Sequence, residues 1–295
     1  MPQMRVNRLY YTASQVQKKL GITHGELYSY VRNGRLHSVT PPGKKLGVYP
    51  RAEVDQLAQE LHIFFAIRDK TEIDFVRATE DDMPRIAEIS RAIFEPNLAA
   101  EEDTVYIETR SAWLKKNPDT MHILKSENTM VGYASLAPLS EEKITQIINE
   151  EISTDEITPE DIEDFSNKKP VHLYIMAIGI DPKYNKYEKH AYGARLISHL
   201  ITFLTLLGHE GIKIETITAR SHKPDGTRLL RKMGFPEVIS PIPSKRLFIL
   251  NIEETGNPLF TKYKEAFREG QRPKPSKINN KRADEKQGKR RNKTL

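Results

Sequence analysis

Apolar and polar positions at the start of the chain follow the period of a helix and predict three helical segments. The first covers residues 15–20, with Ser14 as its N-cap and Gly21 at its end. The second follows Thr23, which can form a capping box with the glutamate three positions later. The third begins at Pro50 or the next residue and carries apolar side chains at every third or fourth position. The chain therefore begins with a small helical domain.

Two strand-like runs lie between the second and third helices. Residues 35–39 and 46–49 are separated by a Pro-Pro-Gly-Lys-Lys segment, which predicts a β-hairpin with a basic tip. On the second helix, one face can pack inward while His24, Tyr28 and Arg32 point outward. Helix, three-residue turn, helix and basic hairpin together form the layout of a winged helix-turn-helix.

The pattern changes near Ile73 and then alternates between strand-like and helix-like runs as far as residue 256. Strands are expected at 74–77, 122–125, 130–136, 171–180, 212–218 and 246–252, and helices at 79–93, 101–116, 192–207 and 227–233. This order predicts an α+β domain over residues 73–256, in which helices flank a mixed central sheet.

Three further segments depart from this pattern. Residues 140–169 hold ten acidic residues and three lysines, which predicts an acidic insertion packed on the domain. The alternative is that this insertion mimics nucleic acid or covers the basic first domain. A C-terminal helix is expected at 257–269, with Asn257 as its cap. Residues 270–295 are rich in lysine and arginine with almost nothing to bury, so a disordered basic tail is expected.

The net charge of the 295 residues is only +6, but its distribution is uneven. Residues 1–62 carry +5, residues 63–261 carry −8, and residues 262–295 carry +9, counting lysine and arginine against aspartate and glutamate. Basic ends favour a polyanionic partner, because neutralising phosphates drives the binding of basic proteins to nucleic acid. Ordinary solvated surface charge is the alternative interpretation.

The composition also excludes several classes of site. Without cysteine the chain has no disulfide framework, thiolate nucleophile or cysteine-based zinc site, and no metal ligand set is predicted. The absence of cysteine fits a cytoplasmic protein. Residues 196–207, the most apolar stretch, are too few to span a bilayer, so no membrane partner is expected.

Five motifs occur between residues 11 and 61. They are Thr12-Ala13-Ser14-Gln15-Val16, Leu20-Gly21-Ile22-Thr23, Leu27-Tyr28, Asn33-Gly34-Arg35-Leu36 and Tyr49-Pro50-Arg51-Ala52-Glu53-Val54. With these motifs residues 1–68 resemble the excisionase and MerR-type winged helix-turn-helix family. The resemblance implies that the second helix enters the major groove of double-stranded DNA and that a homodimer is possible. The implied DNA contacts are Thr23, His24, Tyr28, Arg32, Arg35, Lys44 and Lys45. A small helical domain used for protein contacts is the alternative.

Three motifs occur in the second domain. They are Ile178-Gly179-Ile180-Asp181-Pro182, Ala191-Tyr192-Gly193-Ala194-Arg195-Leu196 and Leu229-Leu230-Arg231-Lys232-Met233-Gly234-Phe235. With them residues 74–252 resemble the Gcn5-related N-acetyltransferase (GNAT) superfamily. The resemblance implies that acetyl-CoA binds where a central strand splays from its neighbour, with its pyrophosphate at a glycine-bearing turn before the next helix. The implied cofactor contacts are Ile178, Ile180, Lys189, His190, Ala191, Tyr192, Gly193 and Ala194.

The glycine-bearing turn departs from the family pattern. The expected basic-or-Gln, x, x, Gly, x, Gly/Ala sequence falls on residues 188–193, where Ala191 replaces the first glycine and Glu188 stands at the basic position. The preceding loop is also about three residues longer than is usual in the family. Lys183, Lys186 and Lys189 can supply positive charge to the phosphates, although a solvated loop would have a similar sequence.

The resemblance also implies an acid and a base for transfer of the acetyl group to an amine. His172 falls at the position of the base in members that use a glutamate there, and a structural role is its alternative. The tyrosine that usually protonates the thiolate is replaced by Leu230, so Tyr174 is the candidate acid, with Ser221 and His222 as alternatives.

The sequence therefore predicts a DNA-binding protein, a transcriptional regulator with an acyl-CoA-binding domain that can acetylate an amine. Two alternatives remain open. In the first, the second domain is a non-catalytic ligand sensor or dimerisation module. In the second, the chain is an acetyltransferase whose first domain binds another protein.

Overall fold

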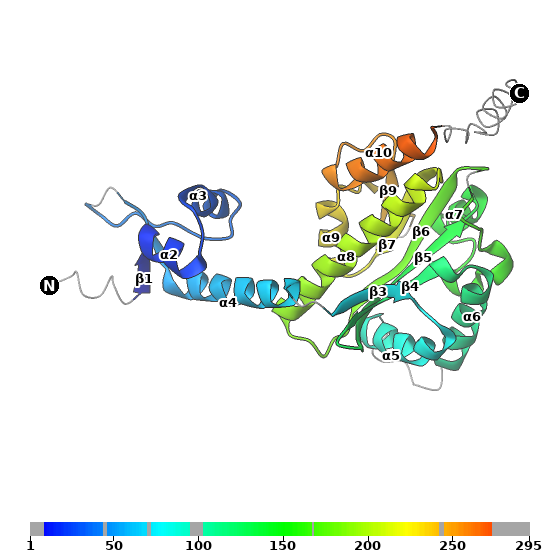
Figure 1. Cartoon of the computed structure of the whole chain (residues 1–295), viewed down its shortest axis with the longest axis horizontal. Coiled ribbons are helices and arrows are strands. Elements are labelled where there is room, and N and C mark those ends of the chain that lie inside the picture. Colours follow the sequence, from blue (N-terminus) through cyan, green and yellow to red (C-terminus); the bar gives the residue numbers. More distant parts are fainter. Residues whose placement is uncertain are drawn as a thin grey trace, which may run out of the picture.

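The computed structural model describes residues 9–43, 46–69, 72–94, 103–166, 168–241 and 245–272. Within these ranges the chain forms a small N-terminal unit and a larger α+β unit, joined by the long helix α4 (Arg51–Arg68) (Figure 1). Ile63, Phe64 and Ile67 near the end of α4 pack into the larger unit. The predicted order of a small helical region followed by an α+β region is confirmed.

The N-terminal unit contains a two-stranded sheet and three helices around a small core. Its elements are β1 (Tyr10–Thr12), α2 (Ala13–Leu20), α3 (His24–Arg32), β2 (Val48–Pro50) and the first part of α4. Val16, Leu27 and Leu36 are almost completely buried in this core. The predicted capping box between Thr23 and Glu26 is present at the start of α3.

The predicted N-cap of α2 is wrong. Thr12, not Ser14, caps the helix, and Ser14 lies inside its first turn. The Thr12 hydroxyl accepts a hydrogen bond from the Gln15 amide, and the Gln15 side chain accepts one from the Thr12 amide. This reciprocal pair satisfies two N–H groups at once, so the helix begins two residues earlier than predicted.

The predicted hairpin between residues 35–39 and 46–49 is shortened in the described residues to one antiparallel bridge, in which Val39 and Val48 exchange both backbone hydrogen bonds. The strand pairing of β2 is made with β1, which the sequence did not predict. The reason is local: the amides of Arg35 and Leu36 both donate to the Tyr30 carbonyl, which holds this segment against α3. Lys44 and Lys45, at the expected tip, lie outside the described residues.

The larger unit is built on a seven-stranded sheet, counted over the described residues, with the order β3-β4-β5-β6-β7-β9-β8. The strands are β3 (Ile73–Arg77), β4 (Met121–Ser126), β5 (Thr129–Leu139), β6 (Val171–Ile180), β7 (Ile214–Ser221), β8 (Glu237–Val238) and β9 (Arg246–Asn251). The helices are α5 (Met83–Phe94), α6 (Asp103–Lys116), α7 (Glu141–Ile148), α8 (Lys186–His209), α9 (Pro224–Lys232) and α10 (Thr261–Gly270). β6 and β7 are parallel, and the other neighbouring strands are antiparallel.

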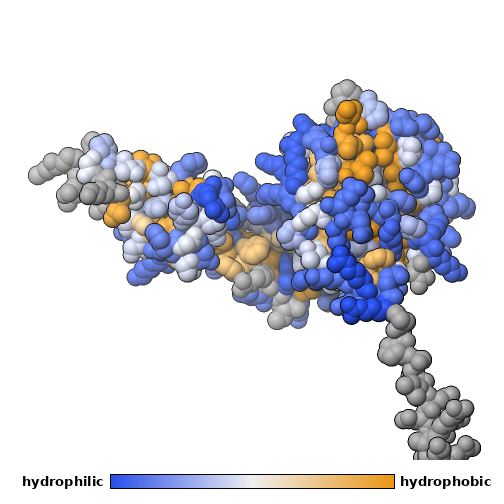
Figure 2. Space-filling view, turned by 90° about the horizontal axis from the view of Figure 1, so that it is seen from above, coloured by the Kyte–Doolittle hydropathy of each residue, from blue (hydrophilic) through white to orange (hydrophobic). Residues whose placement is uncertain are grey.

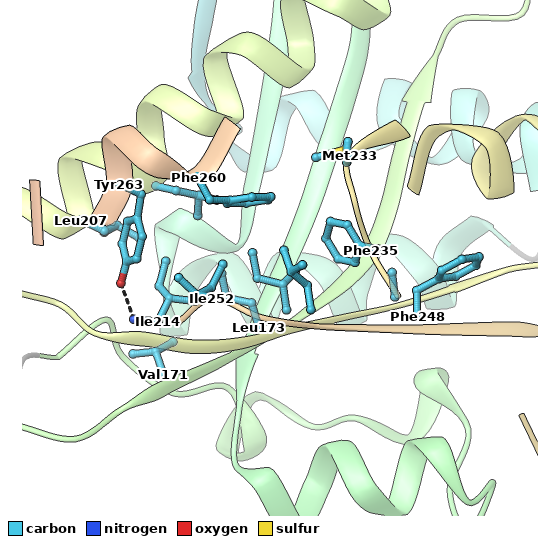
Figure 3. Packing of buried hydrophobic residues seen from close by; sticks show 14 of the residues in the cluster. Val171, Leu173, Leu207, Ile214, Met233, Phe235, Phe248, Ile252, Phe260 and Tyr263 are labelled. Carbon is cyan, nitrogen blue, oxygen red and sulfur yellow. Dashed lines mark hydrogen bonds between the residues drawn. The ribbon is translucent and has the colours of Figure 1, made fainter. Parts of the chain in front are cut away.

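Helices cover both faces of this sheet. One face packs against α8 and α10, and Figure 3 shows part of that core, with Leu173, Phe248 and Phe260 among its buried side chains. The Tyr263 hydroxyl is fixed within it, because it accepts from the Ile214 amide at 2.5 Å and donates to a carbonyl at 3.0 Å. The other face packs against α5, α6 and α7.

Two helices of the larger unit begin earlier than the sequence predicted. α8 starts at Lys186 rather than Tyr192, because Asn185 caps it with its side chain. It continues through Gly208 to His209, and the left-handed residue that follows is Gly211, with φ of 79°. α9 starts at Pro224 rather than after the expected Pro-Asp-Gly turn, since proline fits the first turn of a helix.

The acidic segment 140–169 packs on the domain. It forms α7 and two short 3-10 turns, and Ile144, Ile147 and Ile157 are buried against Trp113. Its acidic side chains therefore lie around an apolar anchor on the face covered by α6. The predicted C-terminal segment begins with the Asn257 cap and Pro258 and continues as α10. Residues 273–295, most of the expected tail, lie outside the described part of the chain.

α8 is longer than the apolar stretch considered in the sequence. Among the described residues it is the one helix whose length and composition would allow it to cross a membrane. In this fold 44% of its apolar window is buried inside the protein, between the sheet, α4 and α10. A core helix meets the same criterion, so the pattern is weak evidence for a membrane span.

Candidate active site and nucleic-acid surface

The central strands β6 and β7 separate halfway along β6. They pair from Val171 to Ile175 on β6 and from Ile214 to Ala219 on β7. β6 continues to Ile180, where its other edge remains paired with β5. In the described residues the edge of β6 beyond Ile175 has no strand partner, so its backbone groups are available to a ligand.

A cleft of about 2410 Å³ opens at this separation. One wall is formed by α8, from Lys186 to Thr205, and by α9, and the opposite wall by α5, α6 and the acidic segment. Figure 2 shows hydrophobic residues gathered on one part of the larger unit, within a surface that is otherwise mostly hydrophilic. The cleft is large enough for an extended ligand that lies between these two walls.

The N-terminus of α8 is closed by its own side chains. Asn185 Oδ1 accepts from the amides of Tyr187 and Glu188, and the Glu188 carboxylate accepts from the Asn185 amide. Ala191 and Gly193, at the expected glycine-bearing turn, lie inside the second turn of the helix. Their amides belong to the helical ladder, so phosphates cannot use them as they would use a free helix end.

The opposite wall carries two buried polar groups with unsatisfied atoms. Arg110 on α6 is 6% exposed, and its Nη1 makes no hydrogen bond within the described residues. Ser135 on β5 is 2% exposed, and its hydroxyl also lacks a hydrogen-bond partner in that part of the chain. Both residues line the cleft.

Tyr174 lies at the point where the two strands begin to separate. Its side chain is almost buried and lines the cleft. Burial raises the pKa of Tyr174 to about 12, with Arg220 opposing the shift and Glu150 adding to it. The hydroxyl is therefore protonated throughout the ordinary range of pH and can act as a hydrogen-bond donor.

Residues 83–235, which is just over half of the chain, match the family described as the Acetyltransferase (GNAT) family. The chain belongs to the GNAT acetyltransferase family. The matched segment begins at α5 and ends after α9, so it contains the splayed strands, α8 and both walls of the cleft. The N-terminal unit lies outside the match.

Solved acetyltransferase structures are similar to this chain at low identity. The paia N-acetyltransferase of Thermoplasma acidophilum, in complex with coenzyme A, is 13% identical over 61% of this chain and 99% of its own, with a TM-score of 0.40. A GNAT-family acetyltransferase of Bacillus cereus is 11% identical over 61% and 96%, with a TM-score of 0.36. A putative acetyltransferase of Pyrococcus horikoshii is 16% identical over 57% of this chain, with a TM-score of 0.37, and the chain spans only 44% of that protein. No curated protein sequence matches the chain.

The GNAT cleft contains most, but not all, of the predicted cofactor contacts. Those that line it are Ile178, Ile180, Lys189, His190, Gly193 and Ala194. Ala191 and Tyr192 face the core instead, where Ala191 is 1% and Tyr192 4% exposed. A helix that starts at Lys186 rotates these two residues toward the sheet, which the sequence did not predict because it placed a loop there.

The predicted acid and base of the GNAT reaction are not brought together in the cleft. Tyr174 lines it, whereas His172 is not among the lining residues. The His172 ring is half-buried, and its Nδ1 lies 2.9 Å from the Thr216 hydroxyl on β7, where the two strands are still paired. The catalytic role of either residue stays a prediction. Ser221 and His222 also line the cleft.

Sequence analysis missed Arg110, Ser135 and a third cleft residue, Glu60. Glu60 lies on α4, and one of its carboxylate oxygens is 3.1 Å from both Arg35 Nη2 and His190 Nδ1. A signal for Arg110 was present: Tyr106, Arg110 and Trp113 stand at i, i+4 and i+7, which places one cation on an aromatic face of a helix. Ser135 and Glu60 carry no such signal in the sequence.

Three of the predicted DNA contacts lie on one face of α3. His24, Tyr28 and Arg32 are exposed and recur every four residues of α3, so they share a face. Thr23 is occupied as the N-cap, and Arg35 is paired with Glu60. The structure thus presents a short exposed row of one imidazole, one phenol and one guanidinium.

Proposed function

We propose that the larger domain transfers an acyl group from an acyl-CoA, with acetyl-CoA as the first candidate, to an amine. The observation that carries this proposal is the splayed cleft of a GNAT-family domain, with an unpaired strand edge on its floor. In the reaction the amine nitrogen forms a bond to the thioester carbonyl carbon, and the carbon–sulfur bond breaks. The ammonium loses one proton to solvent before attack, and the nitrogen loses a second one as the amide forms, which balances the proton that the leaving thiolate gains.

Side chains rather than backbone amides would hold the phosphates of the acyl-CoA. The start of α8 is closed by Asn185 and Glu188, so its amides are already used. Lys186 and Lys189 line the same wall and supply positive charge to it. Cations on flexible stems bind phosphate as point charges, without the fixed geometry of a helix end.

Tyr174 would act as a hydrogen-bond donor and not as the acid. A thiol has a pKa of about 8.5, well below the pKa of about 12 of this tyrosine, so transfer of its proton to a thiolate is unfavourable. A neutral hydroxyl at the strand separation can instead polarise the thioester carbonyl or stabilise the departing sulfur. Solvent can then supply the proton, and rate enhancement would come chiefly from positioning.

Calorimetric titration with acetyl-CoA, followed by an assay of thiol release with a panel of amines, tests this proposal. The Lys186→Ala/Lys189→Ala variant is expected to weaken acetyl-CoA binding about 10- to 100-fold, because each charged contact contributes about 1.5–3 kcal/mol at most. Lys116→Ala, on an exposed lysine at the end of α6, is the matched control. No acetyl-CoA binding by the unmodified protein would refute the proposal.

We propose further that the N-terminal unit is a winged helix-turn-helix that binds double-stranded DNA, so that the protein acts as a transcriptional regulator. The exposed row of His24, Tyr28 and Arg32 on α3 supports this proposal, as does the net charge of +5 over residues 1–62. The +9 of residues 262–295 would add a sequence-independent, salt-dependent contribution to affinity.

Gel-shift titrations over a range of salt concentrations test the DNA proposal. Arg32→Ala is expected to weaken binding by about 5- to 100-fold, with Lys116→Ala at the exposed end of α6 as the charge-matched control. Truncation after Glu269 is expected to reduce the slope of affinity against salt. If neither Arg32→Ala nor the truncation weakens binding, the proposed DNA-contacting surfaces are wrong.

The second candidate is a non-catalytic regulator, in which the GNAT domain senses an acyl-CoA or forms a dimer. Leu230 at the position of the usual acid and the closed start of α8 favour this candidate. Acetyl-CoA binding without thiol release for any amine would support a sensor. A protein that releases thiol but binds no DNA would instead be an acetyltransferase whose first domain contacts another protein.

A further inference from the structure

Arg110 is a buried cation without an adequate counter-ion. Its Nη1 is inaccessible to solvent and makes no hydrogen bond within the described residues. Its Nη2 lies 3.6 Å from Asp155 Oδ1, which is beyond hydrogen-bond distance, and the Asp155 side chain is 84% exposed. Burial lowers the pKa of Arg110, although arginine does not give up its proton in proteins. A buried charge of this kind is costly unless a partner compensates it.

The orientation of this guanidinium is fixed by aromatic rings. Its central carbon lies 3.7 Å from the centroid of Trp113 and 5.3 Å from that of Tyr106. Trp113 is itself held in place, since its indole N–H donates to the Ile157 carbonyl at 3.1 Å. The free N–H groups of Arg110 are therefore presented by a rigid support and not by a mobile surface side chain.

A second donor lies on the strand beside the expected site of acyl transfer. Ser135 on β5 lines the cleft with a buried hydroxyl that has no hydrogen bond in the described chain. In the register of β5 and β6 it faces Ala177, which belongs to the part of β6 that has left β7. Directly opposed residues in neighbouring strands are about 5 Å apart. A ligand group bound at Ser135 on β5 therefore lies beside the part of β6 whose other edge has no strand partner.

We propose that Arg110 and Ser135 form a subsite for the carboxylate of the acyl acceptor, which is therefore a small amino-carboxylate such as a free amino acid. Arginine presents a planar fork of N–H groups that matches a carboxylate, and a serine hydroxyl can add a third hydrogen bond. Both residues line the cleft with almost no exposed surface, so they suit a small molecule that enters the cleft rather than an ordinary surface lysine of a protein. This inference rests on the proposed acyltransferase function.

The test compares free L-amino acids with their carboxamides and with the corresponding decarboxylated amines, on the full chain. Thiol release gives kcat/KM for each compound, and calorimetric titration of the same compounds gives binding without turnover. The amine of a carboxamide is less basic than that of the free acid and more of it is neutral at pH 7. A preference for the acid therefore cannot result from amine reactivity.

The unmodified protein is expected to prefer the acids by about 10- to 100-fold in kcat/KM, the range for charge-assisted hydrogen bonds. Arg110→Met is expected to remove this preference, so that the ratio of kcat/KM between acid and carboxamide falls to about one. Arg110→Lys keeps the charge without the fork and should retain part of the preference. Ser135→Ala should reduce binding of the acids a few-fold, and Arg268→Met on α10 is the control that should change nothing.

Each result bears on one proposal or the other. Equal use of acids and carboxamides, or a preference that survives Arg110→Met, would overturn the carboxylate subsite. Acetyl-CoA binding with no calorimetric binding of any amino acid would also overturn it, while leaving the acyl-CoA proposal intact. Amino-acid binding that depends on Arg110, in a protein that does not bind acetyl-CoA, would keep the subsite and refute the transferase.

Discussion

Arg110 and His122 are both buried nitrogen bases stacked on aromatic rings, yet the fold treats them differently. Arg110 Nη1 and His122 Nδ1 each lack a hydrogen bond within the described residues. His122 on β4 lies away from the cleft, with its ring stacked on Phe75 at 4.9 Å and 4.6 Å from the centroid of Phe203. Arg110 lines the cleft.

The two groups differ in whether they can lose their charge when they are buried. Burial lowers the pKa of His122 to about 4, with Asp119 opposing the shift and Arg77 adding to it, so the imidazole is neutral at pH 7. Arginine cannot neutralise itself in this way and needs an anion. His122 can lose its charge, so its burial affects stability alone. Arg110 cannot lose its charge and lies beside a cleft, so its burial indicates an anionic ligand.

The largest expected effect concerns pH and His122. The folded-state pKa of about 4 is below the unfolded value of about 6.5, so the unfolded chain binds a proton first as the pH falls. Stability is therefore full above pH 6.5 and is lost between pH 6.5 and 4, by roughly 3 kcal/mol from this histidine. Urea denaturation at pH 7, 5.5 and 4.5 measures the loss.

The His122→Leu variant provides the comparison for this titration. It should flatten the dependence on pH over the same range, apart from a part due to His199, whose pKa is also lowered, first by burial and then by Arg195. A free energy of unfolding that stays constant between pH 7 and 4.5 in the unmodified protein would mean that His122 is already charged and paired.

The second prediction concerns the stability of the Arg110→Met variant at pH 7. Because Asp155 is largely exposed and loses little when its partner is removed, the free energy of unfolding should stay the same or rise by about 1 kcal/mol. The stability should depend on pH as in the unmodified protein. A fall of more than about 2 kcal/mol in urea would show that Arg110 is a structural ion-pair partner, and would weaken its contrast with His122.

The sequence was sufficient for the order of the elements, but not for where two of the helices begin. Apolar runs located β6 and α8, since the core of the larger unit depends on them, and the Asn257 cap located the C-terminal helical segment. The start of α8 depends on Asn185 and Glu188, whose spacing is that of a capping box and was passed over because a loop was expected as far as His190. This shift of one and a half turns moved Ala191 and Tyr192 from the expected phosphate site into the core.

The cleft wall that carries Arg110 and Ser135 was not predictable from the sequence for a different reason. Arg110 and Ser135 are far apart in the chain and gain meaning only when α6 packs over β5 and leaves both with unsatisfied atoms. Satisfaction of hydrogen bonds is a property of the three-dimensional structure. The predicted hairpin is shortened to one bridge for a similar reason, because the amides of Arg35 and Leu36 donate to the Tyr30 carbonyl and β2 pairs with β1.

The third prediction concerns the start of α8, where the helix amides are already hydrogen-bonded, in contrast to the unpaired atoms of Arg110 and Ser135. Asn185→Ala removes the cap and should lower the free energy of unfolding by about 1 kcal/mol, measured in urea. The amides of Tyr187 and Glu188 become free, so the affinity for acetyl-CoA should be maintained or increased. A weaker affinity would mean that Asn185 itself contacts the ligand.

The smallest expected effect concerns Glu60, where the N-terminal unit and the acetyltransferase domain meet at one carboxylate. Glu60 lies 3.1 Å from Arg35 on one side and from His190 on the other, and it lines the cleft near the lysines of α8. The negative charge of Glu60 should repel the phosphates of acetyl-CoA, so Glu60→Gln should tighten binding about two- to threefold. The gain should be smaller at high salt, because salt screens the charges.

Calorimetric titration at two salt concentrations measures this effect. The control is Glu53→Gln, which changes a carboxylate that is paired with His37 away from the cleft. If Glu60→Gln weakens binding instead, the carboxylate positions His190 for the ligand, and the α8 wall would depend on the N-terminal unit for its affinity.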